Sequence, residues 1–189
     1  MTGQPSQVTP DVTCGVAHGH DEQPAADRVL VAVFASPVAV FLLRYGVDLG
    51  YRPVLLDPRS DAPAPDGLPA GTLRVSGVAE LGPELAGPAT DAVLTDHHRD
   101  ELGAVLRDLL ASPVRWIGLM GNPRHEGPHV AALAALGVPP SEVARVQRPI
   151  GLDIGSRTPA EIAISTIGGL VADRNGRSGG VLAGRGATG

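Results

Sequence analysis

The sequence predicts an α/β protein with a doubly wound, mostly parallel sheet and helices on both faces. Apolar runs bounded by turn residues alternate along the chain with segments of helical periodicity. The first run is followed by a capped helix and by a second strand that ends in an acid, which is the order of a βαβ unit. A full capping box then opens a long helix near the C-terminus.

The elements follow in order from local signals. The run at 28–33 is uninterrupted and has β-branched residues at alternate positions, as expected for a strand buried on both faces. Ser36 suits a helix N-cap and Pro37 the first helical position, and the helix continues over 38–49. We expect further strands at 52–57, 73–76, 92–95 and 114–120, and further helices at 100–110, 128–135, 141–146 and 158–174.

The last helix has the strongest local signal. Thr158 is a typical N-cap, Pro159 stands at the first helical position, and Glu161 stands where its side chain can return to the cap. We therefore expect one domain over 28–174. It lies between a flexible N-terminal arm (1–27) and a flexible, Gly-rich tail (175–189).

Composition excludes several classes of function. All 15 basic residues are arginine, so no Schiff-base or P-loop lysine is present. The net charge is −5 and no basic tract occurs, which argues against nucleic-acid binding. A single cysteine, Cys14, indicates a reducing, cytoplasmic setting, and no apolar stretch is long enough to span a membrane.

Ligands of open parallel sheets bind beyond the carboxyl ends of the strands, so the residues there are the candidates. After the first strand, a dinucleotide site would need a Gly-x-Gly turn, but residues 34–37 contain no glycine, and Pro37 removes an amide donor. Asp57 stands where a ribose-binding acid would, and Arg59 follows it. NAD(P) binding stays an alternative that the missing glycines weaken.

The segment after the fifth predicted strand contains residues that could bind an anion. Gly121, Asn122 and Arg124 come directly after this strand, and an arginine fork there could hold a phosphate.

The loop before the last helix contains Gly151, Asp153, Gly155 and Arg157. Two glycines in one loop indicate a backbone held for close approach. The alternative is an ordinary tight connection in which Asp153 and Arg157 form a local salt bridge.

The same stretches resemble a known family. PIGLDIGSRTPAEIAIS at 149–165 is similar to the signature of the C-terminal Rossmann domain of the XdhC/CoxI family. DPR at 57–59, TDHH at 95–98 leading into DEL at 100–102, and WIGLMG at 116–121 agree with it in order. The resemblance covers roughly 28–174 and implies a Rossmann-like fold.

The resemblance also implies a function. Members of the family are accessory proteins without activity of their own, which carry molybdenum cofactor and assist its sulfuration and insertion into xanthine or carbon monoxide dehydrogenases. The expected partners are a molybdenum hydroxylase client and a full-length relative or a second copy of this chain. The residues expected to bind cofactor are Asp57, Arg59, Gly121, Asn122, Arg124, Gly151, Asp153, Gly155 and Arg157.

The sequence departs from the family pattern at three places. Only Val38 and Ala39 remain of the family's Gly-Ala-Gly-x-Val-Ala turn, and only Gly121 and Arg124 of its Gly-Ser-Arg-Arg-Thr turn. The family's small, cysteine-bearing N-terminal domain does not fit into 27 residues, so we expect a stand-alone Rossmann half.

Alternatives to the maturation role are an NAD(P)-dependent oxidoreductase and a ligand-free interaction module. Cys14, His18 and His20 contain metal-ligand types, but we expect no metal in a mobile arm. His97 and His98 follow a strand, and one could carry a proton near neutral pH. The hydroxyls of the predicted helix at 165–166 are expected to bond within the protein rather than to act as nucleophiles.

Overall fold

A six-stranded parallel sheet forms the centre of the protein, with the order β3-β2-β1-β4-β5-β6. The computed structural model describes residues 27–59, 61, 63–121 and 127–181. The strands are β1 (Arg28–Val33), β2 (Tyr51–Leu56), β3 (Leu73–Val75), β4 (Thr90–Leu94), β5 (Trp116–Leu119) and β6 (Val146–Gln147). The order reverses between β1 and β4, as in doubly wound nucleotide-binding folds, which confirms the predicted fold class.

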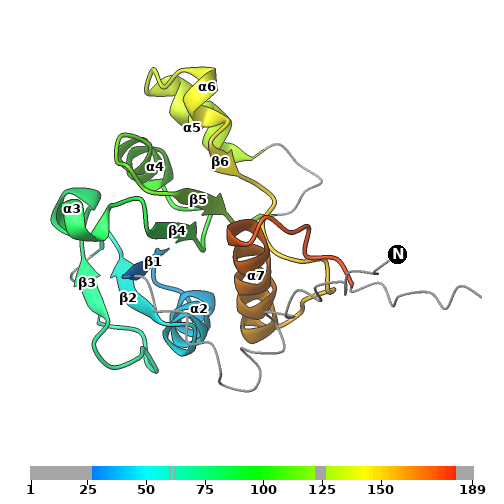
Figure 1. Cartoon of the computed structure of the whole chain (residues 1–189). Helices are drawn as coiled ribbons and strands as arrows, with labels where there is room; N and C mark the ends of the chain where they lie inside the picture. The colour runs from blue at the N-terminus through cyan, green and yellow to red at the C-terminus, as the bar shows by residue number, and fades with distance from the viewer. Residues whose placement is uncertain (1–26, 60, 62, 122–126, 182–189) are drawn as a thin grey trace, which may run out of the picture.

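Helices cover both faces of the sheet, as predicted. They are α2 (Pro37–Asp48), η1 (Val78–Leu81), α3 (Gly82–Leu85), α4 (Leu102–Leu110), α5 (Pro128–Ala135), α6 (Pro140–Val143) and α7 (Pro159–Arg174). Figure 1 shows α2 and α7 side by side, with α3 and α4 across the sheet from them.

Strand β1 divides the core because its side chains alternate between the two faces. Leu30 and Ala32 pack with α2 and α7, whereas Val29, Val31 and Val33 pack with η1, α3, α4 and α5. All five are fully buried. An uninterrupted apolar run is therefore what this central strand requires, since neither face meets water.

Both predicted helix caps are present. The Ser36 hydroxyl accepts a hydrogen bond from the Ala39 amide at 3.1 Å. Thr158 Oγ1 accepts one from the Glu161 amide at 3.2 Å, and the Glu161 carboxylate accepts one from the Thr158 amide at 3.1 Å. The capping box thus sets the first residue of α7 where the sequence predicts it.

The structure corrects the prediction for 141–146. Helix α6 spans Pro140–Val143, and Val146 begins a sixth strand that pairs with Ile117 of β5. Val146 is buried in the core, and a strand of two residues is too short to show alternation in the sequence. The short helices η1 and α3 were not predicted either, because Gly82 and Pro83 interrupt any helical pattern there.

The segments outside 28–174 are described only in part. Residues 1–26 and 182–189, and with them Cys14, His18 and His20, lie outside the described residues. Within 175–181 the Arg177 amide donates to the Ala172 carbonyl at 2.8 Å, so the chain turns back against the end of α7. Across the described part of the chain, no helix is both long and apolar enough to cross a bilayer.

A buried carboxylate fastens the end of α7 to the sheet. Asp91 on β4 is fully buried, and its two oxygens accept hydrogen bonds from Arg115 at 2.7 Å and from Arg174 at 2.7 and 2.9 Å. The Tyr51 hydroxyl donates a further bond at 3.1 Å, and burial raises the pKa of that hydroxyl. Arg115 also pairs with Asp173 of α7 at 2.7 Å, so several donors share the cost of burying one carboxylate.

Replacing Asp91 by asparagine should lower the free energy of unfolding by about 3–5 kcal/mol, because it leaves two arginines beside a neutral group in the protein interior. The measurement is urea unfolding followed by circular dichroism at neutral pH. As a matched control, Asp108→Asn removes an exposed ion pair with Arg107 and should cost less than about 1 kcal/mol. Equal losses in the two variants would contradict this assignment.

Candidate functional site

The turn after β1 has the backbone of a glycine turn and the side chain of a core residue. Phe34 has φ of 71°, in the left-handed region that favours glycine, and its amide donates to Leu56 O at 2.8 Å. Its side chain is fully buried. The strain of this conformation is therefore held by packing, and the ring fills space at the point where the strand order reverses.

Side chains also close the crevice between β1 and β4. The Ser36 hydroxyl donates to Thr95 Oγ1 at 2.9 Å, and Thr95 Oγ1 donates to the Phe34 carbonyl at 2.9 Å. A bound pyrophosphate would need this crevice open and its backbone amides available. Here the chain bridges the crevice with its own groups.

Asp57, the expected ribose-binding acid, is occupied within the protein. Its Oδ2 accepts from the Ala35 amide at 2.7 Å, and its Oδ1 accepts from the Arg59 amide at 3.0 Å and from Arg99 at 2.8 Å. Burial by itself would raise the pKa of Asp57, but the bonds from Arg99 and the two amides lower it below its usual value. The Arg99 guanidinium also lies over the Phe34 ring, 4.7 Å from its centroid.

Glu101 extends this network to the surface. Its carboxylate pairs with Arg59 at 2.8 Å and with Arg99 at 3.3 Å, and these two arginines lower its pKa to about 2. The predicted site residues Asp57 and Arg59 are thus brought together, but through Arg99 and Glu101, which the sequence analysis did not select. The available signal for Glu101 was the DEL stretch at 100–102, which was considered only as part of the family pattern.

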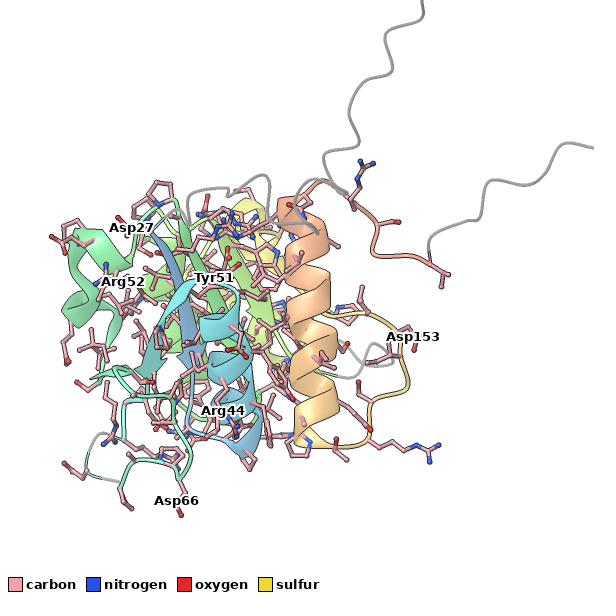
Figure 2. The ribbon with its side chains drawn as sticks, turned by 60° about the horizontal axis from the view of Figure 1, so that its bottom comes forward. Asp27, Arg44, Tyr51, Arg52, Asp66 and Asp153 are labelled. Atoms are coloured by element: carbon pink, nitrogen blue, oxygen red, sulfur yellow. The ribbon has the colours of Figure 1, made fainter. Side chains whose placement is uncertain are left out.

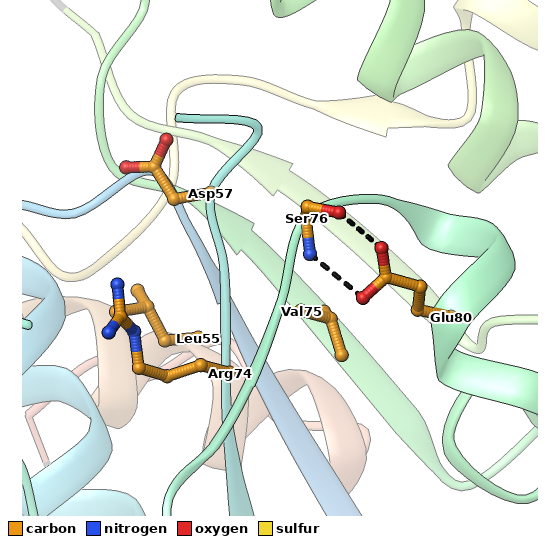
Figure 3. A pocket seen from close by; sticks show the side chains of 6 residues that line it. All are labelled: Leu55, Asp57, Arg74, Val75, Ser76 and Glu80. Atoms are coloured by element: carbon orange, nitrogen blue, oxygen red, sulfur yellow. Dashed lines mark hydrogen bonds between the residues drawn. The ribbon is translucent and has the colours of Figure 1, made fainter. Parts of the chain in front are cut away.

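Two cavities border this network. Figure 3 shows Asp57 beside a cavity of about 240 Å³ that also contacts Arg74 and Ser76, whose amide donates to Glu80 at 3.2 Å. This is smaller than the ~300–1,000 Å³ of typical ligand pockets. The other, of about 420 Å³, lies between the start of α2 and residues 65–67, and none of the predicted site residues lines it.

A third pocket, larger than these two cavities, lies beside the start of α7. Its volume is about 520 Å³, within the range of small-molecule sites. Its wall consists of the two residues that follow β5, the loop before α7 and the first turns of that helix. Four of the predicted residues line it: Gly121, Asp153, Gly155 and Arg157.

Gly151 lies behind this pocket and fixes its wall to the helix. It has φ of 93°, and a Cβ there would lie 2.6 Å from the Ser165 hydroxyl oxygen. Gly169 of α7 also lies close to Gly151, since a Cβ added at Gly169 would lie 2.9 Å from Gly151 Cα. The Ser165 hydroxyl donates to Leu152 O at 2.6 Å, and the Leu152 amide donates to Ser165 O at 3.1 Å.

The hydroxyls of this helix behave as predicted. Ser165 bonds to the loop as described above, and Thr166 Oγ1 donates to the Ile162 carbonyl one turn earlier, at 2.9 Å. Both residues are buried, so each hydroxyl has a structural partner in place of solvent.

The charged groups of the pocket remain separate. Asp153 and Arg157 are both exposed, and the ion pairs among the described residues include none between them, which removes the local salt bridge as an explanation of the loop. Figure 2 shows Asp153 on the loop beside α7. The amide of Arg157 donates to the Glu161 carboxylate at 2.6 Å, so the capping box also holds the backbone of the loop.

The structure therefore divides the predicted residues into two groups. Asp57 and Arg59 belong to the network at the end of β2, whereas Gly121, Asp153, Gly155 and Arg157 line the pocket beside α7. Gly151 packs against α7. Asn122 and Arg124 lie outside the described residues.

Arg148 is a residue at this edge that the sequence analysis missed. It directly follows β6, the strand that was not predicted, and its guanidinium lies against Gly121. Its position just before the PIGLDIG stretch was the available signal.

Substituting Gly151 by alanine should lower the free energy of unfolding by about 1–3 kcal/mol, because a methyl group collides with Ser165 and the left-handed backbone becomes strained. Gly155→Ala is the matched control: it has φ of 66° but no atom within 4 Å of the added carbon, so only the strain of about 1 kcal/mol applies. Urea unfolding of both variants makes the comparison. A larger loss at Gly155 would contradict the packing described.

Comparison with known proteins identifies relatives. The chain is 34% identical over 77 residues to the uncharacterized protein YqeB of Escherichia coli (strain K12), a stretch covering 41% of this chain and 14% of YqeB. Its fold is similar to a crystal structure described as a xanthine dehydrogenase from Bacillus halodurans, with a TM-score of 0.62 and 23% identity over 80% of this chain and 44% of the other. The chain thus spans less than half the length of either protein.

The family is shown by a longer match. Residues 30–170 match the family described as the XdhC Rossmann domain, and this range contains most of β1, all of β2 to β6 and most of α7. The match spans both the Asp57 network and the pocket beside α7. The chain therefore belongs to the XdhC Rossmann-domain family.

Proposed function

We propose that this chain is a non-catalytic accessory protein of a molybdenum hydroxylase of the xanthine or carbon monoxide dehydrogenase type, and that it carries molybdenum cofactor as its cargo. The observation that carries the proposal is the pocket beside α7, around which four residues of the family-like segments converge. Membership of the XdhC family supports the connection to molybdenum hydroxylases. The client enzyme and a full-length relative, or a second copy of the chain, are the proposed protein partners.

The residues of the pocket suit the chemistry of a pterin phosphate. Arg157 offers a planar fork of donors for a phosphate group, and Asp153 offers acceptors for the N–H groups of a pterin ring. The left-handed glycine at 155 leaves the loop backbone open to a ligand, because it carries no side chain. The volume of about 520 Å³ accommodates a small organic molecule.

The side chains of the pocket support a binding role. Arg157 and Asp153 can bind and orient a ligand, while the hydroxyls of Ser165 and Thr166 are engaged with backbone carbonyls. A carrier needs reversible binding, and the pocket lies at the surface, where a client enzyme can reach its contents.

Release of a pterin from the purified protein tests this function. The full chain, produced in a molybdenum-replete host, should release the fluorescent oxidised pterin derivative after denaturation and oxidation. Arg157→Gln should lower the affinity for the cofactor roughly ten- to a hundredfold, because it removes a charged hydrogen bond. Arg107→Gln, in an exposed pair on α4, is the matched control and should leave the yield unchanged.

The outcome against the proposal is equally definite. If neither the protein as purified nor the protein incubated with free cofactor releases a fluorescent pterin, the carrier function is wrong.

A calorimetric titration with NAD(H) and NADP(H) tests the oxidoreductase alternative. We expect no heat and no thermal stabilisation at millimolar ligand, because both oxygens of Asp57 are already bonded and Ser36 bridges the crevice to Thr95. If the protein binds one of these dinucleotides and the Asp57→Asn variant does not, the result would restore the dinucleotide hypothesis.

A further inference from the structure

We infer that the pocket between α2 and the loop after β2 binds a free amino acid with an apolar side chain. The volume of this pocket is about 420 Å³, within the range of small-molecule sites. Among the described residues, none lines both this pocket and the pocket beside α7. The inferred site is therefore a second binding function, which goes beyond the proposed function and does not depend on it.

One wall of this pocket is a single face of α2. Its residues recur at intervals of three and four positions, so their side chains lie together along the helix: Pro37, Val40, Phe41 and Arg44. The first three are apolar, and Phe41 is only half-buried. The guanidinium carbon of Arg44 lies over the Phe41 ring, 5.8 Å from its centroid. This wall thus combines an apolar contact surface with one positive charge.

The opposite wall is formed by residues 65–67 of the loop after β2. A Cβ added at Gly67 would lie 3.5 Å from Val40 Cγ1, so the loop is in van der Waals contact range of the helix. The next residue, Leu68, packs against the same core cluster as α2. Ala35 also lines the pocket, and its amide is fixed by a bond of 2.7 Å to Asp57 Oδ2. Packing and hydrogen bonding therefore position the pocket before any ligand binds.

Two opposite charges line this pocket without pairing. Arg44 on α2 and Asp66 on the loop are both exposed, and the ion pairs among the described residues include neither of them. Figure 2 labels both side chains. The other polar side chain of the pocket is already engaged, since the Ser36 hydroxyl donates to Thr95 Oγ1 and accepts from the Ala39 amide. Arg44 and Asp66 are therefore the charged groups that a ligand would meet.

An amino acid zwitterion matches this arrangement. The Arg44 guanidinium can donate two hydrogen bonds to a carboxylate, and the Asp66 carboxylate can accept from an ammonium group. An apolar side chain would be removed from water between Val40 and Phe41. A residue inside a peptide carries neither main-chain charge, and each terminus of a peptide carries only one. A free amino acid is therefore the class of ligand that uses both charged groups.

The experiment titrates the full chain with L-phenylalanine at neutral pH, using calorimetry and the amide signals in NMR spectra. We expect saturable binding, with shifts centred on the amides of Val40 and Gly67, which line the pocket. Two analogues test the charges: 3-phenylpropionate lacks the ammonium group, and 2-phenylethylamine lacks the carboxylate. Each should bind roughly tenfold more weakly than L-phenylalanine, because one charged hydrogen-bonding partner is lost.

Variants test the same contacts from the side of the protein. Arg44→Gln and Asp66→Asn should each weaken binding of L-phenylalanine roughly tenfold. Arg107→Gln and Asp108→Asn are the matched controls, because they alter an exposed pair on α4, outside the pocket, and should leave the affinity unchanged. Arg44→Lys keeps the charge and loses the fork, so its affinity should fall between those of the wild type and Arg44→Gln. Circular dichroism checks that each variant is folded.

Three results would overturn the inference. One is the absence of binding of both L-phenylalanine and L-leucine at about 10 mM. Another is equal affinity for L-phenylalanine and its two analogues, and the third is binding that both Arg44→Gln and Asp66→Asn leave unchanged. Release of a pterin is a separate readout: it should stay at the full level in Arg44→Gln, because Arg44 does not line the pocket beside α7. The two proposals can therefore fail independently.

Discussion

The placement of α7 is the constraint on which the candidate site depends. At one end of this helix, Arg174 bonds to the buried carboxylate of Asp91 on β4. At the other end, the capping box of Thr158 sets where the helix begins. Gly151 lies against the middle of the helix, at Ser165 and Gly169. The loop that forms the pocket wall is thus held by a helix that is fastened to the sheet, so its backbone is positioned in advance for a ligand.

The two halves of the carboxyl edge have different chemistry. Around β1 and β2, Phe34 fills the turn, Asp57 is bonded within the chain, and Arg99 lies over the aromatic ring. Around β5 and α7, the loop leaves charged groups exposed at a pocket of about 520 Å³. The fold therefore keeps the topology of a dinucleotide-binding domain, while the largest of the three pockets described lies on the other side of the point where the strand order reverses.

Arginine carries out all the cationic roles in this lysine-free chain. In the buried network, the forked guanidinium of Arg174 bonds one carboxylate oxygen and a backbone carbonyl at the same time. At the end of β2, Arg99 both pairs with a carboxylate and covers an aromatic ring. A lysine ammonium has no planar face and would perform only one of these tasks at each place.

Local sequence signals determined most of the fold and part of the site. The apolar run of β1, the Ser36 cap and the Thr158 capping box act within a few residues, so the sequence alone predicted five of the six strands and the long helices. The loop just before the Thr158 capping box also contains three residues that line the pocket: Asp153, Gly155 and Arg157. What the sequence could not reveal was which of its candidate residues would share a site.

Tertiary structure decided that question, because the partners come from distant strands. Arg99 reaches Asp57 across 42 positions of the chain, and Arg174 reaches Asp91 across 83. Arg148 lies against Gly121 only because β6 pairs with β5, in a strand too short to be seen in the sequence. Composition and periodicity determined a doubly wound domain with arginine as its cation, whereas packing of the sheet decided which carboxylate is engaged within the chain and which loop charges remain available to a ligand.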